Sequence, residues 1–300
     1  MNVLTSEKVI LHKYQGAGND FLIVDNREGE FEVVEGFLVR GGWKKEIKVL
    51  CDRRYGIGAD GLMLLEKGNS LRGTDFGMTY FNSYGSGGMM CGNGGRCIVA
   101  FARDCGLESF QFEAADGFHS ASICGGSFGN YTIRLKMKDV HQVISYDSLE
   151  GVTGPSKGWF LDTGTRHYVL FVEDVRKEDV FSRGRAIRYG AKSFLPIGVN
   201  VNFVSPEKGT LWVRTYEKGV EDETLACGTG ITASCIAAFR EGIPASFREE
   251  LPDSSTRARY DVRAVNDCLS VDFIASDSGL SFTDVHLVGP AVRVADIIVD

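Results

Sequence analysis

Short runs in which apolar and polar residues alternate recur along most of the chain and predict β-strands. The clearest runs lie at 161–172, 199–204, 269–274 and 285–288, and an apolar strand is expected near 9–11. Segments with the pattern of helices are few. We therefore expect a strand-rich α+β protein rather than a helical bundle.

Three segments have the composition of helices. The first runs over 96–104 and stops at Gly106, the second runs over 231–241 and stops at Gly242, and a third is expected near 177–181. Glycine directly after a helix is a common C-cap. The first two segments carry alanine and apolar residues nearly all round, which predicts that both helices are buried.

A cysteine and a glycine-rich turn precede each of these two buried helices. The turns read Cys91-Gly92-Asn93-Gly94-Gly95 and Cys227-Gly228-Thr229-Gly230. A cysteine just before a helix faces unpaired backbone N–H groups and the positive end of the helix dipole, which favours the thiolate. The glycines let a ligand approach the backbone closely, so that the N–H groups can bind an anion such as a carboxylate.

The two turns indicate an internal repeat. They are 227 − 91 = 136 residues apart, close to half the chain, and 97–101 matches 235–239 at four of five positions with an offset of 138. We expect two related halves, each contributing one thiol, with a boundary near 138–154.

Length, charge and cysteine use narrow the class of protein. A chain of 300 residues has room for two domains, and 33 − 40 gives a net charge of −7. No basic run offers a nucleic-acid surface, and neither a signal peptide nor a membrane-spanning stretch is seen. We expect a cytoplasmic protein with no nucleic-acid or membrane partner, whose eight cysteines stay reduced.

The remaining cysteines and a second glycine-rich string have structural interpretations. No Cys-x-x-Cys and no zinc-type Cys/His spacing occurs, so no metal site is expected. We expect Cys51, Cys97, Cys105, Cys124, Cys235 and Cys268 to be buried core residues. The string 56–61 matches G-x-G-x-x-G, but it precedes a short apolar strand rather than a helix, so we expect a tight turn and not a dinucleotide site.

Two thiols, each at a helix N-terminus, fit two kinds of chemistry. They could form a redox pair, although such pairs are usually close in sequence. They could also invert a carbon stereocentre, one removing a proton from one face while the other delivers a proton to the opposite face. For an amino acid the weakly acidic Cα proton requires donors that hold the carboxylate and its developing charge, and two helix N-termini can supply them.

Taken together, the motifs resemble the diaminopimelate epimerase family along nearly the whole chain. In chain order, the matching pieces are Gln15-Gly16-Ala17-Gly18-Asn19-Asp20-Phe21, Arg54-Tyr55-Gly56-Ile57-Gly58-Ala59-Asp60-Gly61, Met90-Cys91-Gly92-Asn93-Gly94, Thr163-Gly164 with His167, Val199-Asn200, Tyr216-Glu217 and Thr224-Leu225-Ala226-Cys227-Gly228-Thr229-Gly230.

The resemblance implies a fold, a reaction and a set of residues. The fold would be two pseudo-symmetric domains, 1–138 with 288–300 and 139–287, each a β-barrel-like sheet around a central helix. The reaction would interconvert LL- and meso-diaminopimelate without a cofactor, and a homodimer is compatible with it. The implied residues are the catalytic Cys91 and Cys227, the supporting His167, and the substrate-binding Asn19, Asn82, Gly92, Asn93, Asn200, Glu217, Lys218, Gly228 and Thr229.

The sequence departs from the family pattern beside these residues. Lys218 stands where the family usually has arginine, which keeps the charge but loses the two-pronged guanidinium. Thr165-Arg166 precedes His167, 84–87 lacks the usual acidic residues, and the loop 219–224 is one residue longer. Two alternatives stay open: a racemase of another amino acid on the same fold, and a cysteine-based redox or binding protein.

Overall fold

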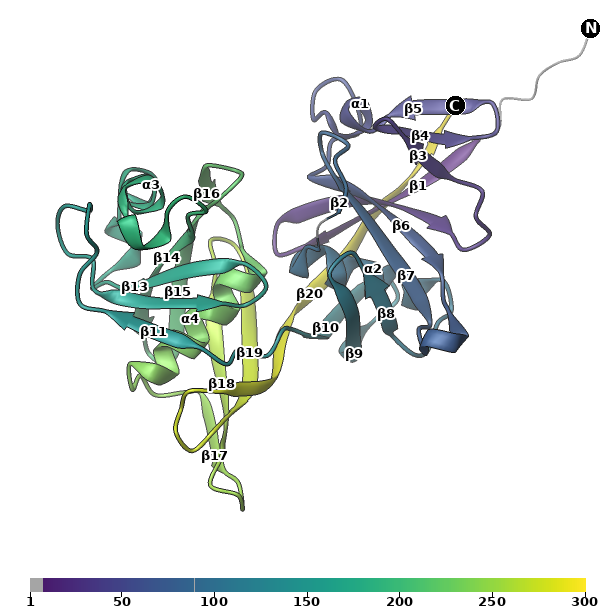
Figure 1. Ribbon diagram of the computed structural model, residues 1–300. Helices are drawn as coiled ribbons and strands as arrows, with labels where there is room; N and C mark the ends of the chain where they lie inside the picture. Colours follow the sequence, from purple (N-terminus) through teal and green to yellow (C-terminus); the bar gives the residue numbers. More distant parts are fainter. Residues whose placement is uncertain (1–7, 89) are drawn as a thin grey trace, which may run out of the picture. The chain divides into compact units, whose positions relative to one another are not determined.

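The computed structural model describes residues 8–88 and 90–300, which fall into two compact units. One unit runs to Leu135 and resumes at Pro290–Asp300, and the other is Lys136–Gly289. In each unit, strands surround one helix, α2 in the first and α4 in the second (Figure 1). The last strand, β20 (Phe282–Val299), contributes to both units.

Eight strands close the first unit into a barrel. Going round it, β1 pairs with β2, followed by β6, β7, β8, β9, β10 and β20, and β20 pairs with β1 again. The pairs β2–β6 and β7–β8 are parallel. Besides β20, the strands are β1 (Val9–Gly16), β2 (Asn19–Asn26), β6 (Gly61–Lys67), β7 (Phe76–Asn82), β8 (Gln111–Ala114), β9 (Gly117–Ser127) and β10 (Asn130–Lys136).

The second unit has a comparable row of strands. Its order is β11, β12, β13, β14, β15, β18, β19 and β20. Val140, just before β11, bridges to Phe282 of β20 and so links the two ends of the row. Besides β20, the strands are β11 (Val143–Tyr146), β12 (Gly158–Asp162), β13 (Arg166–Phe171), β14 (Asn200–Glu207), β15 (Thr210–Glu217), β18 (Thr256–Arg263) and β19 (Cys268–Ala275).

Both units contain further short strands and helices outside the main row of strands. The first unit carries a separate three-stranded sheet, and β16 and β17 extend the second by pairing with β15 and β18. These elements are β3 (Glu32–Val34), β4 (Phe37–Arg40), β5 (Trp43–Glu46), α1 (Ile47–Cys51), η1 (Ser70–Arg72), η2 (Val175–Lys177), α3 (Val180–Gly190), η3 (Lys192–Phe194), β16 (Asp222–Thr224) and β17 (Phe247–Glu250).

The two central helices match each other residue for residue. Helix α2 is Gly92–Asp104 and helix α4 is Gly228–Arg240, so both ends differ by 136. Each helix ends in a Schellman motif with a left-handed glycine, Gly106 (φ +90°) and Gly242 (φ +76°), again 136 apart. The structural offset is therefore 136 throughout, and the sequence match at offset 138 does not reflect the alignment of the helices.

Both helices are buried as predicted, and both begin earlier than predicted. Gly92 and Gly228 already belong to the helices, with Cys91 and Cys227 as extended N-cap residues. Glycine has a low helix propensity, and for this reason the sequence pattern predicted both helix starts several residues too late. The helix expected near 177–181 is present as the short η2 followed by the longer α3.

The strand-rich fold is confirmed, but the burial of the cysteines was only partly predicted. Cys51, Cys97 and Cys235 are buried and Cys105 is half-buried, whereas Cys124 and Cys268 are exposed. Cys124 lies in β9, a strand in which every residue is exposed or half-buried, so a small apolar residue did not imply a core position.

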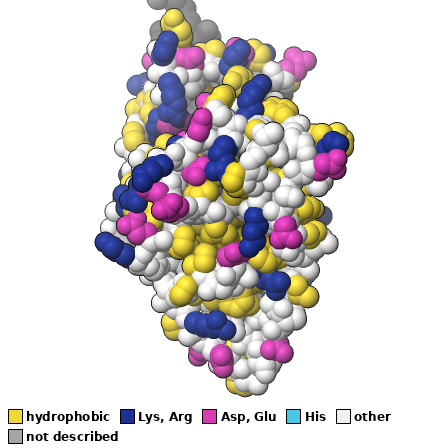
Figure 2. Space-filling view, turned by 90° about the vertical axis from the view of Figure 1, so that its left-hand side faces the viewer, with side chains coloured by type: hydrophobic (Ala, Val, Ile, Leu, Met, Phe, Trp, Pro, Cys, Tyr) yellow, Lys and Arg dark blue, Asp and Glu magenta, His cyan; other side chains and the backbone are white. Residues whose placement is uncertain are grey.

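The surface mixes charges of both signs. On the face shown in Figure 2, lysine and arginine side chains lie among aspartate and glutamate rather than gathering in one region. Within residues 8–88 and 90–300, no helix combines the length and apolar character needed to cross a membrane.

Candidate functional site

The Cys91 cluster consists of Cys91, Asn93, Asn19 and Asp60 at one end of the first barrel. The sulfur of Cys91 accepts a hydrogen bond from the backbone N–H of Gly94 at 3.5 Å. Asn93, which is 2% exposed, donates from Nδ2 to Oδ1 of Asn19 at 2.5 Å, and Asn19 donates to Asp60 at 2.9 Å. The start of β2 is thereby tied to the first turn of α2, just behind the thiol.

Charged side chains extend this cluster. Arg53 donates to Asp20 and to Asp60, and Lys13 pairs with Asp20 at 2.9 Å. Burial alone would raise the pKa of Asp20, but the hydrogen bonds from Arg53 and Lys13 outweigh it and lower that pKa. The support behind Cys91 is therefore ionic.

A buried guanidinium holds the first turn of α2 from inside the barrel. Arg96 has no exposed surface, and its Nη2 donates to Oδ1 of Asn93 at 3.0 Å. Its other nitrogens lie 3.5 Å from the carbonyl of Gly92 and 3.3 Å from that of Pro290. Arg96 was not predicted from the sequence, because arginine is rarely fully buried.

Asn82 stabilises the turn that follows β7. Its Oδ1 accepts from the backbone N–H groups of Tyr84 and Ser86, each at 3.0 Å. It pairs with Gly61 of β6, and β6 lies beside β2. The side-chain oxygen of Asn82 thus accepts hydrogen bonds within the turn that precedes Cys91 in the sequence.

The string 56–61 forms the tight turn that its context predicted. It leads into β6, and a side chain on Gly56 would collide with the carbonyl oxygens of Val49 and Leu50. Gly58 has a φ of +81°, a left-handed conformation that favours glycine. These glycines serve close backbone packing.

The Cys227 cluster consists of Cys227, Thr229, Thr165 and His167 at the start of α4. The sulfur of Cys227, a residue 8% exposed, lies 3.4 Å from the hydroxyl oxygen of Thr229. Nε2 of His167 lies 3.0 Å from that same oxygen and 2.9 Å from the hydroxyl oxygen of Thr165. A hydroxyl group thus links the histidine to the sulfur.

His167 is an uncharged member of this cluster. Its side chain has no exposed surface, and this burial lowers its pKa to about 3, although the negative charge of Asp162 acts in the opposite direction. His167 is therefore neutral at the pH of most cells, and the support behind Cys227 carries no charge of its own.

Asn200, Lys218 and Glu217 lie around the same helix start. Asn200 donates to the carbonyl of Arg166 at 3.1 Å and accepts from the backbone N–H of Lys218 at 2.8 Å. Glu217 accepts from the hydroxyl of Thr224 at 2.8 Å. Lys218 is exposed.

Thr165 in the cluster, and Asn202 and Thr215 beside it, were not predicted to belong to the site. Asn202 bonds to Nδ1 of His167 at 3.1 Å, Thr215 donates to Asn202 at 2.9 Å, and Thr165 lies between His167 and Asn200. A signal for Asn202 existed: it follows Asn200 by two residues in a strand whose neighbours are buried, so both side chains share one face.

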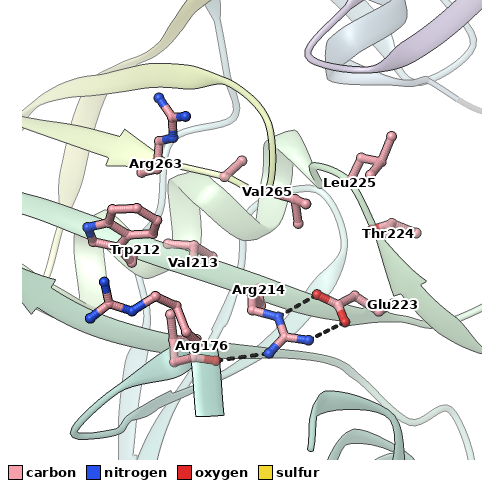
Figure 3. A pocket seen from close by; sticks show the side chains of 11 residues that line it. Arg176, Trp212, Val213, Arg214, Glu223, Thr224, Leu225, Arg263 and Val265 are labelled. Carbon is pink, nitrogen blue, oxygen red and sulfur yellow. Dashed lines mark hydrogen bonds and ion pairs between the residues drawn. The ribbon is translucent and has the colours of Figure 1, made fainter. Parts of the chain in front are cut away.

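A pocket of about 500 Å³ lies in the second unit, and Cys227 is not among the residues that line it. It is lined by Val175, Arg176, Trp212, Val213, Arg214, Glu223, Thr224, Leu225, Arg263, Ala264 and Val265. Figure 3 shows the side chains of Arg214 and Glu223 facing each other across two hydrogen bonds, both 2.6 Å. Neither Cys227 nor His167 lines it, so the pocket's size does not mark the thiol chemistry.

In the described part of the chain, no group of three or more His, Cys, Asp or Glu side chains could hold a metal ion. The groups brought together are instead thiols, hydroxyls, amides and backbone N–H groups at helix starts. Such an arrangement can bind an anion and exchange protons.

Comparison with known proteins gives one consistent family. The family model described as "Diaminopimelate epimerase" matches residues 11–126 and 159–253. A diaminopimelate epimerase from Flavobacterium psychrophilum is 41% identical, covering 94% of this chain and 96% of that relative. One from Aquifex aeolicus is also 41% identical, covering 77% of this chain and 81% of that relative.

Solved structures show the same fold at low sequence identity. A probable proline racemase from Agrobacterium radiobacter has a TM-score of 0.66 at 14% identity, covering 97% of this chain and 93% of that one. A hydroxyproline epimerase from Agrobacterium vitis has a TM-score of 0.64 at 14% identity, covering 98% and 93%. These likenesses concern the fold alone.

Proposed function

The chain belongs to the diaminopimelate epimerase family, and from that premise we propose that Cys91 and Cys227 are its two acid–base groups. As a member it is an isomerase, an epimerase with a small-molecule substrate. We propose that it interconverts LL- and meso-diaminopimelate at Cα. One observation carries the proposal: the N-cap residue of each buried central helix is a cysteine.

The proposed reaction moves one proton off and one proton on. The thiolate of one cysteine removes the proton from Cα, forming an S–H bond while the C–H electron pair passes into the carboxylate. The thiol of the other cysteine then protonates Cα from the opposite face, which inverts the centre. The pair of thiols ends with its protonation states exchanged, so the reverse reaction starts from the other cysteine.

The helix starts would hold the carboxylate. The first backbone N–H groups of a helix have no partner within it. In α4 the N–H of Ile231 is the one that donates to the carbonyl of Cys227, so those of Gly228 and Thr229 precede the helical ladder. Donors of this kind stabilise the charge that develops as Cα loses its proton. We propose the same role for Gly92 and Asn93 in α2.

Polar residues beside the helix starts would bind the rest of the substrate. We propose Asn19, Asn82, Asn200 and Glu217 for its amino and carboxylate groups, and Lys218 for the distal carboxylate. Lys218 is exposed and its backbone is fixed by Asn200, which leaves a cationic ammonium at the end of a flexible stem. A lysine gives charge attraction without the two-pronged geometry of arginine.

Incubation with LL-diaminopimelate in deuterated water tests the proposed function. The expected result is formation of the meso form with deuterium at Cα, because the second thiol exchanges its proton with solvent before delivery. Deuterium in proline or hydroxyproline but not in diaminopimelate would overturn the proposed substrate. Turnover that requires reversible oxidation of the two cysteines would favour the redox alternative instead.

We also propose a cytoplasmic location and leave a homodimer as a prediction. Glutathione keeps thiols reduced in the cytoplasm, and the proposed proton transfer requires Cys91 and Cys227 in the reduced state. Sedimentation of the purified protein tests the oligomeric state.

A further inference from the structure

We propose that Asn202 and Thr215 are positioning residues that fix the tautomer of His167, so that the hydroxyl of Thr229 donates its proton to the sulfur of Cys227. The inference rests on the proposed function only in taking Cys227 as one of the two reactive thiols. Neither Asn202 nor Thr215 has a place in the proposed chemistry itself.

The orientation of the Asn202 amide is the first step. Its Nδ2 lies 3.3 Å from the carbonyl oxygen of Tyr168, which can only accept a hydrogen bond. Its Oδ1 accepts from the hydroxyl of Thr215 at 2.9 Å. The amide is thus held with its NH₂ group toward Tyr168, and the same NH₂ group lies 3.1 Å from Nδ1 of His167.

The orientation of Asn202 decides which ring nitrogen of His167 carries the proton. A neutral imidazole has one N–H donor and one bare nitrogen. Because Asn202 donates to Nδ1, Nδ1 is the bare nitrogen and Nε2 carries the proton. The ring is fully buried and burial keeps it neutral, so the form with a proton on both nitrogens does not compete with this tautomer.

The proton on Nε2 then sets the direction of the two hydroxyls. Nε2 lies 2.9 Å from the hydroxyl oxygen of Thr165, which also receives Nδ2 of Asn200 at 3.4 Å, so both lone pairs of that oxygen are used. Thr165 can donate to the hydroxyl oxygen of Thr229 at 3.1 Å. The hydroxyl proton of Thr229 is left with the sulfur of Cys227, 3.4 Å away, as its acceptor.

With the opposite tautomer of His167, the hydroxyl of Thr229 would donate to the histidine and not to the sulfur of Cys227. A bare Nε2, 3.0 Å from the hydroxyl of Thr229, would accept the proton that otherwise points to the sulfur. Among charged groups, Asp162 on β12 acts on His167, and Glu217 on β15 accepts a hydrogen bond from Thr224. Because a thiolate gains most from such a donor, the tautomer biases Cys227 toward the thiolate.

The substitution Asn202→Asp tests this direction. A carboxylate offers no N–H to Nδ1, so we expect the proton of His167 to move to Nδ1. Nitrogen NMR of histidine-labelled protein, with His167→Gln to assign the signal, reads the tautomer directly. Site-resolved alkylation by iodoacetamide reads the thiolate, and we expect an about tenfold slower reaction of Cys227 at pH 7. Cys91 in the same molecules is the internal reference.

Thr215 provides an uncharged version of the same test. Thr215→Val removes the donor that pins Oδ1 of Asn202, and we expect an about threefold slower alkylation of Cys227. Thr215→Ser keeps the hydroxyl and should restore the rate and the tautomer of the unsubstituted protein. A merely structural role of Thr215 would move neither readout toward the result of Asn202→Asp.

Two results would overturn the inference. One is a signal showing Nδ1 of His167 protonated in the unsubstituted protein. The other is an unchanged tautomer and unchanged Cys227 alkylation in both Asn202→Asp and Thr215→Val. Both readouts are independent of turnover. If diaminopimelate acquires no deuterium but these results hold, the proposed function fails while this inference stands.

Discussion

The starts of α2 and α4 are built alike and supported differently. Both have a cysteine as N-cap, a glycine as first helical residue and a buried first turn. Behind Cys91 lies an ionic network of Asp20, Asp60, Arg53 and Lys13. Behind Cys227 lies a chain of neutral groups that ends in a buried histidine and its amide partner.

The difference continues inside the helices. Residue 96 and its counterpart 232, again 136 apart, both donate to the carbonyl of the first helical glycine, at 3.5 Å from Arg96 and 3.0 Å from Thr232. In both helices the side chain at this position donates to the carbonyl of the first helical residue, but it is charged in α2 and neutral in α4. The two helix starts therefore share a backbone design, and their side-chain environments should respond differently to mutation, pH and salt.

The largest contrast is expected at this position. Arg96→Met removes the hydrogen bonds to Oδ1 of Asn93 and to the carbonyl oxygens of Gly92 and Pro290 and leaves these acceptors without that donor, so we expect the free energy of unfolding to fall by about 3–5 kcal/mol. Thr232→Val removes one hydrogen bond and should cost about 1 kcal/mol. Urea unfolding of both variants measures the contrast. Equal losses would show that the charge at 96 has no special role.

The glycines one turn into each helix give the next contrast. A side chain on Gly230 would overlap Oδ1 of Asn202 and press on His167, whereas one on Gly94 would meet the flexible ends of Met63 and Met78. We expect Gly230→Ala to cost about 1–3 kcal/mol, and Gly94→Ala to be neutral or stabilising by up to about 1 kcal/mol. Thermal unfolding compares them. A tolerated Gly230→Ala would contradict the tight packing around Asn202.

The pH dependence of stability should separate the clusters further. With a pKa of about 3 when folded, His167 binds its proton less readily than in the unfolded chain, whose histidine pKa is about 6.5. The unfolded state thus takes up protons as pH falls below about 6.5, and stability decreases by up to about 1.4 kcal/mol per pH unit down to about pH 3.

Unfolding of the unsubstituted protein and of His167→Gln at a series of pH values isolates this effect. The stability difference between them should rise with pH up to about 6.5 and stay level above it, since other groups cancel. A difference independent of pH would mean that His167 is protonated or solvated in the folded state.

The smallest contrast is expected from salt. Asp20 owes its lowered pKa to Arg53 and Lys13, and Arg53 is more than half exposed. Asp20→Asn should cost about 1 kcal/mol or less, and 1 M sodium chloride should reduce that cost by screening. The cost of Thr215→Val should not change with salt. Salt effects of equal size on the two variants would remove the distinction between ionic and neutral support.

The sequence predicted what local signals encode. Cysteine followed by glycines and then an apolar run marks an N-cap and a buried helix, so Cys91, Cys227 and both helices could be placed without coordinates. Alternation predicted strands and the class of fold. Gly106 and Gly242 were recognisable as helix ends because a left-handed residue is needed there.

Contacts that depend on long-range pairing could not be predicted. His167 meets Asn202 because β13 and β14 are parallel with His167 beside Asn200, and the connection between those strands spans a helix. Arginine is usually a surface residue, so the sequence did not predict that Arg96 is buried. The closed barrel around it excludes solvent, and its guanidinium donates to Asn93 and to the carbonyls of Gly92 and Pro290. Cys124 and Cys268 show the opposite error, because they were predicted to be buried and are exposed.

The most direct test of the two-thiol mechanism is the rate of LL-to-meso conversion in Cys91→Ala and Cys227→Ala, each measured in deuterated water beside the unsubstituted protein. A methyl group can neither remove nor deliver a proton, so each variant should lose at least about 10³-fold in turnover while keeping its fold. If either variant retains turnover within about tenfold of the unsubstituted protein, the two cysteines are not the paired acid and base.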